Sequence, residues 1–213
     1  MELFVGTTTT GEVWSQQPDD SLFPYAFTAV DGSATQDLAD DFSFVNDTTL
    51  TTARWFGGTF NGDPTLTFRI TIHEDASGIP GTSIFGPVPV TPSSATTGRQ
   101  MDGGPSILDD GIPDEFEFEA APPGGFTATG GVTYWLEIGG IQTGTIDLFT
   151  WTSSSSVTGD GNDLGASQFV DASTTWTASA GVFDRAFELD GEVDTTELRA
   201  FGCNLDGASV CPE

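Results

Sequence analysis

Three glutamates alternate with phenylalanines in the run DEFEFEA, at positions 115, 117 and 119. Alternate residues of a β-strand share one face and lie about 6.6 Å apart along the backbone. Retaining glycoside hydrolysis needs two carboxyl groups about 5–5.5 Å apart, so this spacing does not exclude it. A glycoside hydrolase using Glu115 and Glu119 is therefore a remote alternative. The simpler interpretation is a solvated strand face on an acidic protein.

Jelly-roll glycosidases of the laminarinase kind carry a similar strand, Glu-x-Asp-x-Glu. Here Glu117 replaces the central aspartate and no flanking residue matches that motif. A Ser-His-Asp triad would have to use His73, the one imidazole, which falls at the end of an exposed strand face. G-x-S-x-G elbows, phosphate loops and dinucleotide fingerprints are absent from the sequence. We therefore expect a protein that is not an enzyme.

Oxygen-bearing side chains recur in the run DGNDLGASQFVD. Against the 12-residue calcium loop of an EF-hand, Asp160, Asn162 and Asp171 fall at the first, third and twelfth positions. Leu164 occupies the fifth position, where an oxygen ligand is needed. A weak calcium site and a plain polar loop are both open at this point. No cofactor is required, and calcium is the one that the sequence suggests.

Aromatic residues offer a second kind of binding site. Phe149 and Trp151 lie two residues apart on one strand face, and Trp176 can join them as a ligand-binding surface. An indole face suits stacking against a neutral glycan, which a strongly acidic protein does not repel. The alternative is that these rings fill the space between two sheets.

Two cysteines bracket a short C-terminal loop, CNLDGASVC. In an oxidising compartment Cys203 and Cys211 are expected to pair and contribute about 2–3 kcal/mol. The alternative is two thiols in a cytosolic tail. A zinc site is disfavoured because two cysteines and a distant histidine do not make a ligand set.

Charge is the strongest compositional signal. Asp and Glu number 32 against 5 Arg and no Lys, which gives a net charge of −27 over 213 residues. Such a field repels nucleic acid and anionic membranes, so we expect neither as a partner. The apolar runs are too short for membrane insertion, and the N-terminus lacks the basic and apolar regions of a signal peptide. A leader has been removed or none existed, and the paired cysteines favour a secreted, extracellular or cell-surface protein.

The element that organises these groups is a strand of alternating residues. Leu66, Phe68, Ile70 and Ile72 predict an apolar face, and the intervening residues up to His73 predict a wet one. The preceding run WFGGTF is predicted to pair with this strand as a β-hairpin. A second sheet has to cover the apolar face.

Further alternating runs recur along the chain and predict strands, whereas no helix of normal length is predicted. We therefore expect an all-β fold, a two-sheet antiparallel β-sandwich of the jelly-roll-like type. Its domain spans residues 31–195, between a β-prone arm over 1–30 and a tail over 196–213 that carries the expected disulfide.

The chain also resembles a known kind of module. ADDFSF, ARWFGGTF, FRITIHEDASGIPG, TYWLEI, FTWTSS and AFELDG occur in the order seen in a jelly-roll-like module of secreted, cell-surface-anchored bacterial proteins. The resemblance covers about residues 36–191 and extends in general form to carbohydrate-binding modules. It implies a β-sandwich outside the cell and says almost nothing of activity.

Two functions follow as expectations. The first is a non-catalytic structural or adhesive protein, a surface or filament subunit that assembles with copies of itself through its arm. Leu3, Val5 and Val13 would fill a groove of the neighbour while the arm adds a strand to its sheet. The alternative is a calcium-stabilised carbohydrate-binding module with an extracellular glycan as its partner.

Overall fold

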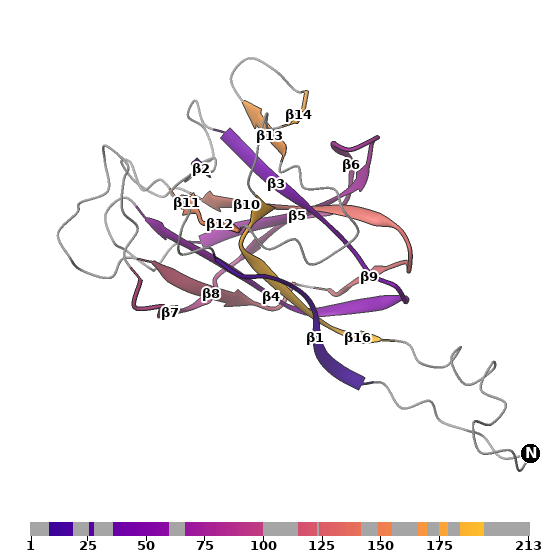
Figure 1. The fold of residues 1–213 in the computed structure, drawn as a ribbon, viewed down its shortest axis with the longest axis horizontal. Helices are drawn as coiled ribbons and strands as arrows, with labels where there is room; N and C mark the ends of the chain where they lie inside the picture. The colour runs from indigo at the N-terminus through magenta and orange to yellow at the C-terminus, as the bar shows by residue number, and fades with distance from the viewer. Residues whose placement is uncertain are drawn as a thin grey trace, which may run out of the picture.

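The computed structural model describes residues 9–18, 26–27, 36–59, 67–99, 115–122, 124–141, 149–154, 166–169, 175–178 and 184–193. Every regular element in these ranges is a β-strand, arranged in two layers (Figure 1). Within the same ranges no helix is long and apolar enough to span a membrane. The pairings are antiparallel, and the two main sheets are open. The predicted all-β sandwich is confirmed.

Two large sheets and one small pair hold the described strands. Sheet A follows the order β1 (Thr9–Gln16), β16 (Phe187–Val193), β4 (Thr48–Thr59), β11 (Phe149–Trp151) and β2 (Ala26–Phe27), with β8 (Phe116–Ala120), β9 (Phe126–Ala128) and β7 (Ser93–Thr96) added from β4 outward. Sheet B follows the order β14 (Thr177–Ala178), β13 (Ala166–Phe169), β3 (Gln36–Ser43), β10 (Thr133–Ile141), β5 (Thr67–Asp75) and β6 (Pro80–Val90). The small pair is β12 (Ser153–Ser154) with β15 (Asp184–Arg185).

Strand β4 is the centre of sheet A. Its 12 residues pair with β16 and β11 along one edge, and with β8 and β9 along the other. A bulge opposite the Asp190–Gly191 step shifts the register, so that Leu50, Ala53 and Trp55 all face the core. Where β11 pairs with β4, a Cβ added to Gly57 would lie 2.5 Å from the Phe149 ring. Only glycine permits this approach.

The expected hairpin of β4 with β5 is wrong. The two strands lie in different sheets, and Trp55 meets Phe68 across the core with ring centroids 5.0 Å apart. Alternation reports which face of a strand is buried, but it does not report which strand is the neighbour. The hairpin that does form joins β5 to β6, where Asp75 accepts hydrogen bonds from the Ser77 and Gly78 amides at 3.2 and 2.9 Å.

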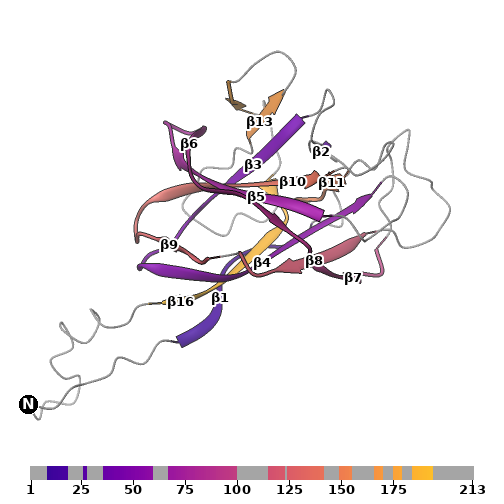
Figure 2. The ribbon, with the colours of Figure 1, turned by 180° about the vertical axis from the view of Figure 1, so that it is seen from behind.

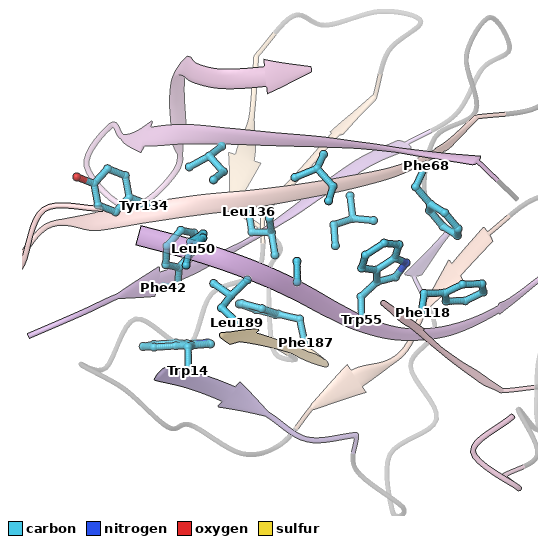
Figure 3. Packing of buried hydrophobic residues seen from close by; sticks show 14 of the residues in the cluster. Trp14, Phe42, Leu50, Trp55, Phe68, Phe118, Tyr134, Leu136, Phe187 and Leu189 are labelled. Atoms are coloured by element: carbon cyan, nitrogen blue, oxygen red, sulfur yellow. The ribbon is translucent and has the colours of Figure 1, made fainter. Parts of the chain in front are cut away.

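Aromatic side chains from both sheets fill the space between them (Figure 3). Edge-to-face and tilted ring contacts link β4, β5, β8 and β11, which is the packing that ring quadrupoles favour. The predicted apolar face is confirmed for Phe68, Ile70 and Ile72, which are fully buried, whereas Leu66 lies outside the described residues. Phe118 is buried as well, and Phe116 packs against the same cluster.

The described part of the expected N-terminal arm belongs to sheet A. Strand β1 lies along β16, at the edge of the lower layer in both views (Figures 1 and 2). Trp14 is 8 % exposed, and its ring stacks on Phe187 with centroids 6.4 Å apart. Strand β2 pairs with β11 in the same sheet. These residues therefore help to form the sandwich.

Candidate functional site

Glu115, the first of the three expected acids, is held inside the protein. Its side chain is 2 % exposed, and its two oxygens accept hydrogen bonds from the Thr152 and Thr97 hydroxyls, both at 2.8 Å. The Arg99 guanidinium lies 3.4 Å away. Backbone hydrogen bonds between this residue and the chain after β7 extend the β7–β8 pairing by one step. The carboxylate thus connects the start of β8 to the residue that follows β11 and to the extension of β7.

The other two glutamates lie on the outer face of sheet A, around Arg54. Its guanidinium lies 3.8 Å from Glu117, 2.8 Å from Glu119, 3.5 Å from Glu188 and 2.6 Å from Asp190. The hydrogen bond to Asp190 is the main reason why the pKa of this arginine is raised, although burial opposes it. One cation thus joins three strands of an otherwise acidic face.

The two acids of the remote hydrolase alternative are not brought together. Glu115 points to Thr97 just after β7 and to Thr152 just after β11, whereas Glu119 points to Arg54 and has a side chain that is 46 % exposed. Four residues of extended chain separate their backbones by about 13 Å, far beyond the carboxyl spacing of a retaining pair.

The most chemically varied cluster of described side chains lies on the outer face of sheet B. We call it the outer-face network; its members are Asp37, Arg69, His73, Glu137 and Trp176. They come from β3, β5 and β10, whose register places them side by side, and from the segment beside β14. The expectation that this face of β5 is wet is wrong at Thr71 and His73, which are buried.

His73 is hydrogen-bonded through both ring nitrogens. Nδ1 lies 3.2 Å from the Gly81 carbonyl oxygen, and Nε2 lies 2.7 Å from Glu137 Oε2. A carbonyl oxygen only accepts, so Nδ1 is the donor of the first bond and carries a proton. The second bond then needs one more proton, shared between the imidazole and the carboxyl group. The hydrogen bond between His73 and Glu137 connects β5 to β10 on the outer face of sheet B.

Asp37 and Glu137 share one guanidinium. Arg69 Nη2 lies 3.6 Å from an oxygen of each carboxylate. The pKa of Asp37 is raised to about 6, mainly by burial and then by the charge of Glu137, although Arg69 and His73 act in the opposite direction. Asp37 therefore gains a proton more readily than an exposed aspartate would.

Trp176 partly covers this network. Its ring lies 5.5 Å from the His73 ring, at 75° to it, and it packs against the buried pair Ala39 and Trp135. The Trp135 indole in turn donates to Asp75 at 3.0 Å. Trp176 is only partly buried, so it keeps some accessible ring surface.

The expectation that Phe149 and Trp151 form a glycan-binding surface is wrong. Both rings are fully buried between the sheets, and the Trp151 indole donates to the Ala186 carbonyl oxygen at 2.9 Å. Neither ring has a face open to a ligand. The alternative interpretation, that they fill the core, describes their place in the structure; of the three expected aromatics, Trp176 alone keeps accessible surface.

A second buried polar cluster was not predicted from the sequence. Asp40 faces the interior from β3 and accepts a hydrogen bond from the Arg185 amide, while Arg185 Nη1 donates to the Ser153 hydroxyl at 3.0 Å. Burial raises the pKa of Asp40 well above its usual value and lowers that of Arg185. The signal was present: Asp40 stands between Leu38 and Phe42 at an inward position, where a charge needs a partner.

Several expected residues lie outside the described part of the chain. They are the calcium-loop residues Asp160, Asn162 and Asp171, the pair Cys203 and Cys211, and the arm residues Leu3 and Val5. The backbone of Val13 is described within β1, beside a bulge. Among the described residues, no three His, Cys, Asp or Glu side chains are grouped to hold a metal ion.

No model of a known protein family matches this chain, and no curated protein matches its sequence. Function therefore has to be inferred from the arrangement of the chain's own residues.

Proposed function

We propose that this protein is a non-catalytic structural or adhesive β-sandwich module that works outside the cell, in assemblies of its own copies. One observation carries the proposal: the acids and the imidazole that resemble catalytic groups are bonded to one another and to the frame. Glu115 joins two threonines, and His73 joins Glu137 to the Gly81 carbonyl. Groups held in this way stiffen a scaffold, whereas a general acid or base needs access to a substrate.

Charge sets the conditions under which copies of this protein can assemble. At −27, copies repel one another in dilute salt, and this repulsion weakens as the screening length falls from about 10 Å at 0.1 M to about 3 Å at 1 M salt. A lysine-free chain cannot form lysine isopeptide cross-links, so its assemblies have to be held by non-covalent contacts or disulfides. Assembly should therefore depend on salt and protein concentration.

Electron microscopy of the purified chain tests this proposal. At 0.15 M and 1 M NaCl, we expect single particles to give way to ordered oligomers or filaments as salt and concentration rise. Discrete single particles under every condition would contradict the proposal. Disordered clumps would contradict it as well, because a structural subunit makes one repeated contact.

A second candidate is a calcium-stabilised glycan-binding module, and the position of Trp176 favours it. This ring is partly accessible and lies against His73, which is hydrogen-bonded to Glu137. Glu137 and Arg69 form an ion pair in the same network, and both are groups that can bind sugar hydroxyls. The glycan-binding proposal predicts that Trp176→Ala abolishes retention on a panel of immobilised neutral polysaccharides without unfolding the protein. It also predicts that EDTA lowers the melting temperature. Retention that survives the substitution would contradict this site.

A further inference from the structure

Strand β1 is attached to the sandwich through one neighbour. Its register runs from Thr9 opposite Val193 to Gln16 opposite Phe187, and no other described strand pairs with it. Its anchor is Trp14, whose ring points from β1 toward Phe187 and Leu189 (Figure 3). The strand therefore occupies one site, which we call the β1 slot: the free edge of β16 together with the core surface around Phe187.

The position of β1 in the chain makes it separable. It is the first described strand, and nine residues separate Gln16 from Ala26, where β2 begins. Nine extended residues span about 30 Å, which is comparable to the width of a small domain. Pro18 lies just past the strand and favours an extended conformation for Gln17. A tether of this length allows β1 to reach a neighbouring molecule.

We propose that β1 of one copy leaves its own sheet and completes sheet A of a second copy, in the slot beside β16. This inference rests on the proposed function, because it supplies the contact that joins the copies. The occupant fits because the incoming strand has the same sequence as the strand it replaces. Trp14 of the donor then stacks on Phe187 of the acceptor, and each acceptor can donate its own β1 to a third copy.

The other long sheet edge is less suited to joining copies. Strand β6, at the edge of sheet B, contains Pro80, Pro87 and Pro89, and proline cannot donate a ladder hydrogen bond. Strand β7, which ends one branch of sheet A, has four residues. An exchanged β1 brings both the backbone ladder and a tryptophan anchor.

Exchange competes with docking in the same chain, and concentration decides between them. The contacts are equivalent in both states, so the tether's effective concentration, on the order of millimolar, favours the closed monomer in dilute solution. High local concentration and screened charge favour exchange. This balance accounts for the salt and concentration dependence expected of the assembly.

Mixed cysteine variants test the inference. Ser15 lies directly opposite Glu188 in the β1–β16 register, so one chain carries Ser15→Cys and a second, tagged chain carries Glu188→Cys. Both also carry Cys203→Ser and Cys211→Ser. After incubation in 1 M NaCl and mild oxidation, we expect a covalent heterodimer on a non-reducing gel.

The matched control replaces Glu188→Cys by Glu192→Cys, which lies opposite Thr10. The cysteine on β16 is then four residues, or about 14 Å, out of register with position 15, whereas a disulfide needs Cα atoms within about 7 Å. We expect at least tenfold less heterodimer with this control. Equal cross-linking in both mixtures would overturn the inference.

The outcomes separate the inference from the function beneath it. If the native chain assembles but the Ser15/Glu188 heterodimer does not form, exchange is overturned and the structural function stands. Ser15→Cys homodimers alone would show pairing of β1 with β1, which also overturns exchange. If the native chain assembles under no condition, the proposed function fails, and the inference fails with it.

Discussion

Truncation of Trp14 is the most informative perturbation of the N-terminal strand. A buried tryptophan removes about 150–250 Å² from water, and at about 25 cal/mol per Å² this contributes about 4–6 kcal/mol. With 8 % of the residue still exposed and an alanine left in place, we expect Trp14→Ala to lower the free energy of unfolding by about 3–5 kcal/mol. The loss cannot exceed the docking energy of β1, because an undocked strand costs nothing more.

Urea unfolding followed by circular dichroism measures this change, and hydrogen exchange localises it. The variant should lose amide protection in β16 before it loses protection in β5 and β10, because β16 is the strand that β1 pairs with. The matched control is Ser15→Ala, which removes a partly buried hydrogen bond of 3.3 Å to Glu188 and an exposed one of 2.9 Å from Gln17. It should cost less than about 1 kcal/mol. A Trp14→Ala change no larger than the control's would refute the view that β1 completes the sandwich.

Three further substitutions test the buried polar groups and the closest strand contact. Glu115→Ala should cost about 2–4 kcal/mol in urea unfolding, because it removes the hydrogen bond of the buried Thr152 hydroxyl and one hydrogen bond of the partly buried Thr97 hydroxyl. Glu119→Ala should cost at most about 1 kcal/mol, and equal costs would contradict the assignment. Asp37 has a raised folded pKa of about 6, so its ionisation weakens the fold as pH rises from about 4 through 6. Asp37→Asn should therefore raise the urea midpoint relative to the native chain at pH 7.5 and lose that advantage by pH 4; a pH-independent difference would argue against this cause. Gly57→Ala should cost more than about 2 kcal/mol, since the new methyl group meets the Phe149 ring and the Thr150 carbonyl, and a neutral result would show that β11 is not packed on β4 as described.

The fold class was predictable because burial alternates with period two along the strands. Phe68, Ile70 and Ile72 show this pattern, and their inward direction follows from the residues alone. The pairing of β4 was not predictable in the same way. The run WFGGTF does not indicate that β4 lies across the core from β5. Strand order depends on the packing of the whole chain.

The polar groups were harder to place, for a related reason. His73 falls on a face that alternation predicts to be wet, yet it is buried. Its ring contacts Trp176, about a hundred residues later in the chain, and is hydrogen-bonded to Glu137. Asp40 was the reverse case, because its inward position was readable and its partner Arg185 was not. Phe149 and Trp151 show why aromatics are ambiguous: the same residues serve a core and a binding surface, and only burial separates the two uses.

The most direct measurement is the molar mass of a chain whose β1 is locked in place. With Ser15→Cys and Glu188→Cys in one molecule and the native cysteines replaced by serine, oxidation in dilute solution should close a disulfide between β1 and β16. Light scattering in 1 M NaCl should then report a monomer, and reduction should restore the higher mass of the native chain. Assembly that is unaffected by the lock would contradict exchange of the N-terminal strand.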